Sequence, residues 1–178
     1  TKKTLNVIMA PPGIGKTTVL VHFASSYLRD GLNVLYISME MSREMISQRI
    51  DENILGITKE DLFALPKNLF LKRIKTLREK TKGNLIVEEF PTGLASVIHF
   101  RHLLQELNLK KNFKPDVIFV DYLNICASSK KKANVGLYEY GKSLAEELRS
   151  LAVEFDVPIW TATQTGRSGF KATDVDMD

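Results

Sequence analysis

The sequence predicts an α/β fold, in which a central and mainly parallel β-sheet is flanked by helices. One observation is the alternation of short β-branched or apolar runs with longer segments of helical periodicity, which is typical of βαβ units. A second is the run 116–122, where the four apolar residues from Val117 to Val120 indicate a strand that is buried on both faces. Buried strands joined by helices are characteristic of a parallel sheet that is covered on both sides.

The first strand–helix–strand unit occupies residues 4–38. Residues 4–9 and 33–38 are predicted as strands, and apolar residues at helical spacing predict a helix over 16–29 that Gly31 ends. A strand, a helix and a strand within so short a stretch form a βαβ unit, whose two strands run parallel.

The remaining segments continue the alternation. A helix capped by Ser42 and ended by Gly56 comes next, and one or two helices over 62–77 are broken near Pro66. The later elements are expected as a strand at 84–90, a helix over 97–107, a strand at 116–122, a helix from 144 up to 156 and a strand at 158–164.

The stretch A-P-P-G-I-G-K-T-T, at 10–18, directly follows the first strand and matches the phosphate-loop pattern, with Ala10 where the usual form has Gly. Gly13 and Gly15 allow a turn that aims successive N–H groups at a phosphate, and the helix that begins near Lys16 adds its positive end. Because the motif lies between a strand and a helix, it predicts the binding of a nucleotide such as ATP. The alternative is a fortuitous strand–turn–helix in which Lys16 is merely solvated.

Particular residues of this loop have expected roles. Lys16 would supply a mobile positive charge for the outer phosphates, and the Thr17 hydroxyl would hold Mg²⁺. Pro11 and Pro12 have no N–H, so the hydrogen-bond donors are expected from Gly13 onward. The predicted nucleotide-binding residues are Pro12, Gly13, Ile14, Gly15, Lys16, Thr17 and Thr18.

Three polar residues are placed at the carboxyl ends of predicted strands, where ligands of open α/β sheets gather: Glu40, Asp121 and Gln164. Asp121 would hold Mg²⁺ through a water molecule, and Glu40 is the carboxylate that could accept a proton from an attacking water. The Gln164 amide could donate to the outermost phosphate. Glu40 could instead stabilise the helix that follows it, and Gln164 could simply end its strand.

Several segments together resemble the successive motifs of the RecA-type motor domain of DnaB-family replicative helicases, and most closely the T-even-type phage branch of that family. They are the phosphate loop at 10–18, S-M-E-M at 38–41, V-I-F-V-D-Y-L at 117–123 and T-A-T-Q at 161–164. The resemblance implies a RecA-like fold. It also implies that Glu40 is the catalytic base, that Asp121 belongs to the magnesium site, and that Gln164 contacts the γ-phosphate, with Lys16 as the third catalytic residue.

The same resemblance implies an ATP-dependent motor, which forms homo-hexameric rings, moves 5′ to 3′ on single-stranded DNA, separates duplex strands at the replication fork, and works with a primase and a helicase loader. Residues 1–178 would then be one motor domain, a fragment without the family's N-terminal collar domain, C-terminal strands and arginine finger. A RecA- or RadA-like recombinase, a KaiC-like ATPase and a non-hydrolysing nucleotide-binding module remain as alternatives.

Two loops of the family face the channel of the ring, and they correspond here to 128–136 and 165–178. Positive side chains in such loops would follow the phosphate backbone of DNA without reading its sequence. The alternative is that the lysine run is a solvated stretch of loop. The predicted DNA-binding residues are Lys130, Lys131, Lys132, Arg167 and Lys171.

The composition is compatible with these expectations and also indicates the cellular compartment in which the protein works. The 178 residues carry 44% hydrophobic and 26% charged side chains, and the net charge of +4 is a mild indication of an anionic partner. The single cysteine, Cys126, excludes a disulfide within the chain and fits a reducing environment. Without an apolar run long enough to span a bilayer or a signal peptide, we expect no membrane association and a cytoplasmic protein, in the host bacterium if a phage encodes it.

Overall fold

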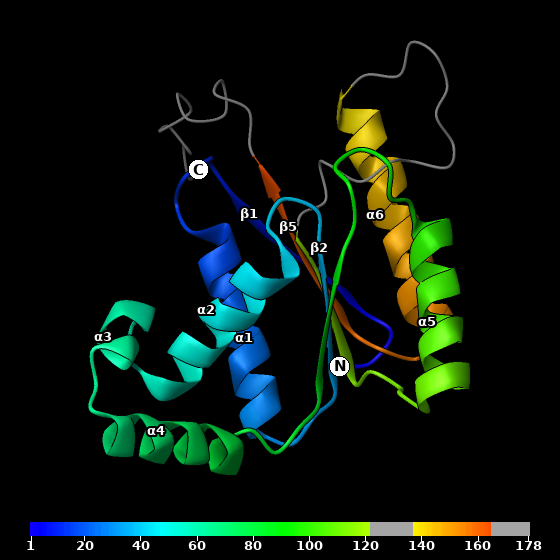
Figure 1. Ribbon diagram of the computed structural model, residues 1–178. Coiled ribbons are helices and arrows are strands. Elements are labelled where there is room, and N and C mark those ends of the chain that lie inside the picture. The colour runs from blue at the N-terminus through cyan, green and yellow to red at the C-terminus, as the bar shows by residue number, and fades with distance from the viewer. Residues whose placement is uncertain (122–136, 165–178) are drawn as a thin grey trace, which may run out of the picture.

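The computed structural model of the chain describes residues 1–121 and 137–164. Their order confirms the predicted alternation of strands and helices (Figure 1). The elements are β1 (Leu5–Ala10), α1 (Lys16–Arg29), β2 (Val34–Ser38), α2 (Arg43–Leu55), α3 (Lys59–Phe63), α4 (Lys67–Lys80), β3 (Leu85–Glu89), α5 (Val97–Lys111), β4 (Val117–Asp121), α6 (Leu137–Glu154) and β5 (Ile159–Gln164).

The five described strands form one sheet in the order β1-β5-β4-β2-β3, and every neighbouring pair is parallel, as predicted. β1 and β2 are consecutive in the chain, yet β5 and β4 lie between them. Because all the strands point the same way, the carboxyl ends of β1, β5, β4 and β2 share one edge of the sheet, which is where ligands bind in open α/β folds.

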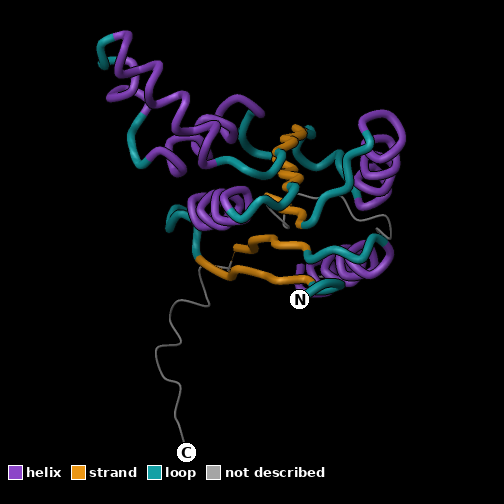
Figure 2. The backbone as a smooth tube through the Cα atoms, turned by 90° about the horizontal axis from the view of Figure 1, so that it is seen from below, coloured by secondary structure: helices purple, strands orange, loops and turns teal. Residues whose placement is uncertain are grey.

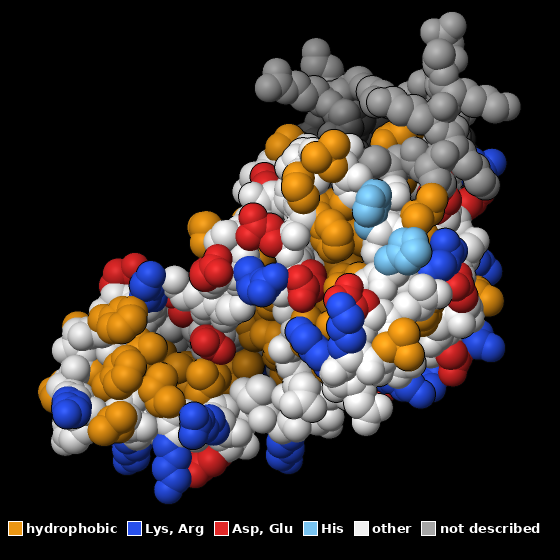
Figure 3. All heavy atoms as spheres, turned by 45° about the vertical axis from the view of Figure 1, so that its right-hand side comes forward, with side chains coloured by type: hydrophobic (Ala, Val, Ile, Leu, Met, Phe, Trp, Pro, Cys, Tyr) orange, Lys and Arg blue, Asp and Glu red, His pale blue; other side chains and the backbone are white. Residues whose placement is uncertain are grey.

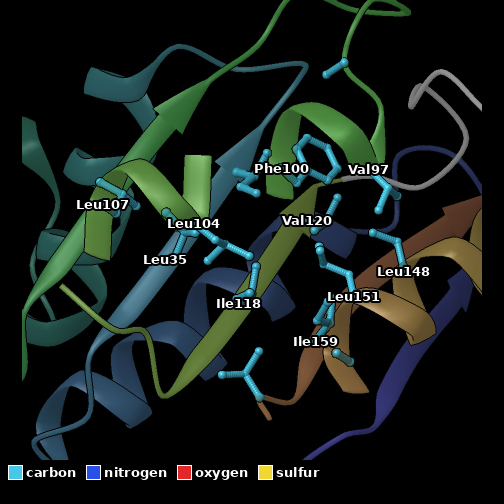
Figure 4. Close-up of a cluster of buried hydrophobic side chains, with 14 of the residues drawn as sticks. Leu35, Val97, Phe100, Leu104, Leu107, Ile118, Val120, Leu148, Leu151 and Ile159 are labelled. Carbon is cyan, nitrogen blue, oxygen red and sulfur yellow. The ribbon is translucent and has the colours of Figure 1, made fainter. Parts of the chain in front are cut away.

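Helices cover both faces of the sheet (Figures 1 and 2). Alternate residues of each strand point to opposite faces, so Leu35 and Ile37 of β2 pack on the side of α5 and α6, while Val34 and Tyr36 pack on the side of α1 and α2. Figure 4 shows the first of these clusters, where side chains of β2, β4 and β5 meet those of α5 and α6. The predicted burial of the Val117–Val120 run is confirmed, since each of its residues is 0% exposed.

The segment after α2 contains two helices, and Pro66 is the N-cap of α4. Neither α3 nor α4 has a fully buried residue, and α4 contacts the body of the domain through α2. Apolar side chains lie on this projecting part in Figure 3. Phe63, Leu69 and Leu71 of α3 and α4 are exposed apolar residues. In the described part of the chain, no helix combines the length and the apolar character that a bilayer span requires.

Candidate active site

The phosphate loop lies between the end of β1 and the start of α1, as predicted. Gly13 and Gly15 have φ angles of 78° and 85°, in the left-handed region that costs any other residue about 1–2 kcal/mol. Gly15 is the N-cap of α1, which has neither a side-chain cap nor an acidic residue in its first turn. No acidic side chain from the first turn of α1 itself therefore competes with a bound anion for the first N–H groups of the helix.

Lys16, the first residue of α1, is folded back over the beginning of the loop. Its side chain is almost completely buried, and its Nζ donates to the carbonyl oxygens of Pro11 (2.8 Å) and Ala10 (3.3 Å). These contacts keep a positive charge beside the loop. The same ammonium group could exchange carbonyl oxygens for phosphate oxygens without leaving the site.

Asp121 is the last residue of β4 and is 1% exposed. Its Oδ2 accepts a hydrogen bond of 3.0 Å from the Tyr36 hydroxyl, whereas its Oδ1 is buried without a partner among the described residues. Burial raises the pKa of Asp121, and the nearby charge of Glu40 raises it further. The nearby hydroxyls of Tyr36 and Thr17 act in the opposite direction on this pKa, and so does the positive charge of Arg49.

Glu40 lies in a turn that hydrogen bonds hold against the end of β4. The Ser38 hydroxyl donates to the Met41 carbonyl (2.6 Å) and accepts from the Met41 N–H (3.1 Å). The Met39 N–H donates to the main-chain carbonyl of Asp121 at 3.1 Å. The exposed Glu40 carboxylate therefore follows a backbone that is tied to Asp121, and it is close enough to raise the pKa of that residue.

The helix that follows Glu40 tests the alternative that Glu40 only stabilises this helix through its dipole. Ser42 is the N-cap of α2 and its side chain accepts from the Met45 N–H, as predicted. The acidic residue in the first turn of α2 is Glu44, not Glu40, which lies two residues before the cap. A stabilising effect of the helix dipole is therefore available from Glu44 and does not require Glu40.

Gln164 ends β5, and the register between β1 and β5 places it opposite Ala10, the residue from which the phosphate loop departs. β5 is also fixed to β4, because the Thr161 hydroxyl donates to the Val120 carbonyl at 2.8 Å. The described pairing of β4 with β5 stops at Val120, one residue before Asp121. The sheet thus brings Gln164 and Asp121 to the same edge as the loop.

Two residues of this site, Tyr36 and Arg49, were not expected from the sequence. Tyr36 stands between the apolar residues Leu35 and Ile37 in the middle of β2, and its hydroxyl group was the available signal. Arg49 is exposed on α2, lowers the pKa of Asp121, and lines a cavity of about 620 Å³ together with Thr18 and Asn53. Nothing in the apolar spacing of α2 marks Arg49, since its place beside Asp121 arises only from the packing of α2 on the sheet.

The residues around Asp121 fit a magnesium ion that accompanies a nucleotide. Asp121 Oδ1 is a buried carboxylate oxygen without a partner in the described part of the chain, and the Thr17 hydroxyl lies beside the same carboxyl group. Mg²⁺ takes oxygen donors and is usually held by one or two protein side chains together with substrate phosphates. It therefore needs no cluster of three or more acidic or histidine side chains, and the described residues contain no such cluster.

The predicted DNA-binding residues lie outside the described residues, as does Cys126. They are Lys130, Lys131, Lys132, Arg167 and Lys171. Their role stays a prediction.

The strand–loop–helix geometry, with carboxylates at the ends of neighbouring parallel strands, is that of the phosphate-loop class of α/β domains. Residues 1–174 match the family described as DnaB-like helicase C-terminal domain, and the chain belongs to this family.

Three relatives with similar sequences show how much of the chain, and how much of each relative, the similarity covers. The chain is 45% identical over 178 residues to a DnaB-like replicative helicase of Enterobacteria phage T4, covering 98% of the chain and 38% of the relative. It is 32% identical to a probable plasmid replicative DNA helicase of Chlamydia psittaci (90% and 34% covered) and 28% identical to the replicative DNA helicase DnaB of Helicobacter pylori strain 26695 (94% and 34%). The chain thus spans between 34% and 38% of the length of these relatives.

Two solved structures share the fold. One, of a DnaB-like replicative helicase and its interactions with primase, aligns with a TM-score of 0.71 at 19% identity and covers 97% of this chain and 41% of the other. The second, of an ATPase domain, aligns with a TM-score of 0.73 at 19% identity, with 98% and 62% covered. The predicted mainly parallel, RecA-like α/β fold is therefore confirmed.

Proposed function

We propose that this chain is the ATP-hydrolysing motor of a replicative DNA helicase. The observation that supports it most strongly is the meeting of Thr17, Asp121 and Glu40 at the end of the phosphate loop. The hydroxyl of Thr17 and the charge of Glu40 both act on the Asp121 carboxyl group, although the three residues come from different parts of the chain. Membership of the DnaB-like family supports the same proposal.

In the proposed reaction, the loop N–H groups and the Lys16 ammonium hold the phosphates. Thr17 would hold Mg²⁺ directly and Asp121 through a water, and the ion would neutralise charge on the β- and γ-phosphate oxygens. Glu40 takes a proton from the water that attacks the γ-phosphate. Gln164 donates to the γ-phosphate from the neighbouring strand end.

The Glu40→Gln variant tests this reaction. It keeps the size and polarity of the side chain but cannot accept the proton, so turnover of ATP should fall about 10²- to 10⁴-fold while nucleotide affinity stays within about twofold. Steady-state hydrolysis and the binding of a fluorescent ATP analogue give the two quantities. Glu44→Gln is the matched control, because Glu44 lies in the first turn of α2 and should leave both unchanged. An unchanged rate for Glu40→Gln would remove Glu40 from the chemistry.

We further propose, from the family resemblance, that the protein acts as a homo-hexameric ring on single-stranded DNA, moves 5′ to 3′, unwinds the fork, and works with a primase and a loader in the cytoplasm. A solved relative is described with its interactions with primase, which supports that partner. Residues 1–178 would be one motor domain, with a collar domain and an arginine finger elsewhere in the protein. Displacement of a forked strand by the intact protein separates this proposal from a recombinase-like ATPase, which would hydrolyse ATP without unwinding.

The DNA contacts proposed for this motor are the cations of two loops, Lys130, Lys131 and Lys132 in one and Arg167 and Lys171 in the other. Replacing the three lysines by alanine should weaken binding to single-stranded DNA and make the negative slope of log affinity against log salt less steep by about 2 per subunit, because three phosphate contacts per subunit are lost. Affinity measured at several salt concentrations gives the slope. Unaltered affinity and slope would exclude the first loop from the interface.

A further inference from the structure

The hydroxyl of Tyr36 occupies an unusual place for a polar group. Tyr36 is the middle residue of β2, a strand with neighbours on both sides, and its side chain is 0% exposed. A buried phenol must find a hydrogen-bond partner, since leaving it unpaired costs free energy. The partner here is Oδ2 of Asp121, at 3.0 Å.

The Tyr36 ring is held by stacking on Phe119, which in turn packs against Tyr27. Tyr36 stands opposite Phe119 in the register between β2 and β4, and the two rings stack with centroids 5.8 Å apart at an angle of 14°. Tyr27 of α1 contacts the Phe119 ring edge-on at 6.1 Å. A tyrosine held in this way is a rigid donor, in contrast to a long flexible side chain on the surface.

The register also explains why the hydroxyl meets a carboxylate. Two residues further along the same strand pair, Ser38 stands opposite Asp121, so Tyr36 and Asp121 project from the same face of the sheet on neighbouring strands. With Oδ2 occupied by the hydroxyl, Oδ1 is the oxygen left without a partner among the described residues. The carboxyl group is therefore held in one orientation.

We propose that Tyr36 is a positioning residue for the metal site: it holds Asp121 Oδ2 so that Oδ1 faces the water through which Asp121 would hold the magnesium ion that accompanies the nucleotide. This inference rests on the proposed function, because it needs Asp121 to act on that ion. Hydrogen bonds from a second layer of residues orient metal-binding carboxylates in this way, and their loss typically weakens metal affinity 10- to 100-fold.

The Tyr36→Phe variant removes only the hydroxyl and keeps the ring against Phe119. In the intact protein, binding of a fluorescent ADP is measured over a series of Mg²⁺ concentrations and in EDTA. The Mg²⁺ concentration at half-saturation should rise about 10- to 100-fold, while the affinity in EDTA changes by less than about twofold. A purely structural hydroxyl would lower the unfolding temperature and leave the Mg²⁺ half-saturation unchanged, and that result would overturn the inference.

Two further variants make the test specific. Tyr27→Phe removes a hydroxyl from the other ring that packs on Phe119, and it should leave the Mg²⁺ half-saturation unchanged. In an Asp121→Ala background, Tyr36→Phe should add less than about a twofold effect, because the two residues act through one hydrogen bond. An additional tenfold effect in that background would show that Tyr36 does not act through Asp121.

Asp121→Ala alone separates this inference from the proposed function. If it raises the Mg²⁺ half-saturation and Tyr36→Phe does not, the metal role of Asp121 stands and only the role of Tyr36 is wrong. If Asp121→Ala itself leaves the Mg²⁺ dependence unchanged, the proposed metal site fails and the inference fails with it.

Discussion

Asp121 is a residue of the site whose burial is unfavourable for the stability of the folded protein. It is a carboxylate at the end of a buried strand, one oxygen is hydrogen-bonded to Tyr36, and the other has no partner within the described ranges. Burying a carboxylate that is only partly compensated destabilises the folded protein. Proteins commonly accept such a cost where the group binds a ligand or an ion.

The pH dependence of stability should show this cost. Burial raises the pKa of Asp121 in the folded state above its ordinary value of 3.8, so between these two pKa values the folded protein holds a proton that the unfolded chain has lost. The contribution of Asp121 to stability therefore decreases as the pH rises through this window and stays low at neutral pH.

Asp121→Asn removes the charge while keeping an oxygen for the Tyr36 hydroxyl. In EDTA at neutral pH, this variant should unfold at a higher urea concentration than the wild type, and the difference should shrink on acidification through the window. The measurement is urea unfolding of both proteins across this pH range. A variant that is less stable than the wild type at neutral pH would show that the ionised carboxylate is well compensated in the fold.

Some residues of the site could be predicted from the sequence, because short local patterns mark them. Lys16 and Thr17 belong to a contiguous motif, and Glu40, Asp121 and Gln164 each follow a recognisable strand, so their meeting at one sheet edge follows from parallel topology. Tyr36 and Arg49 could not be found in this way, because their approach to Asp121 depends on the register of β2 with β4 and on the docking of α2.

At the level of elements, the helices and strands follow from local patterns, whereas the strand order does not. The predicted break near Pro66 is confirmed, since Pro66 is the N-cap of α4. Proline is compatible with a helix start because its missing N–H is not needed there for a helical hydrogen bond. β5 and β4 lie between β1 and β2 in the sheet. No local pattern in the sequence predicts this order, because it depends on where strands from later in the chain pair.

Two of the described glycines should respond oppositely to alanine. A Cβ on Gly83, just before β3, would overlap the main-chain carbonyl group of Leu32, so Gly83→Ala must displace backbone and should destabilise by about 1–3 kcal/mol. A Cβ on Gly141 in α6 meets nothing within 4 Å, so Gly141→Ala should stabilise by up to about 1 kcal/mol.

Thermal or urea unfolding of the two variants gives this comparison directly, with the wild type as reference. Equal effects of the two substitutions would mean that the 82–84 turn does not approach α1 and β2 as closely as the structure has it.

At the scale of the whole molecule, the layers of helices and sheet determine where the candidate site lies. The helix pair α1 and α2 covers one face of the sheet, α5 and α6 cover the other, and the phosphate loop opens at the shared carboxyl edge (Figure 1). The described residues therefore supply the nucleotide side of the proposed motor. The relatives are longer, since the chain spans 38% of the phage T4 helicase, and coupling to DNA is a property proposed for the intact protein.

The most direct test of the account is a structure of the intact protein with Mg²⁺ and a non-hydrolysable ATP analogue. We predict the triphosphate on the loop around Lys16, the ion about 2.1 Å from the Thr17 hydroxyl, and Glu40 within reach of the γ-phosphate through one water. A triphosphate bound elsewhere, for example in the cavity beside Arg49 and Asn53, with Glu40 and Asp121 more than about 10 Å (roughly a helix diameter) from its γ-phosphate, would contradict it.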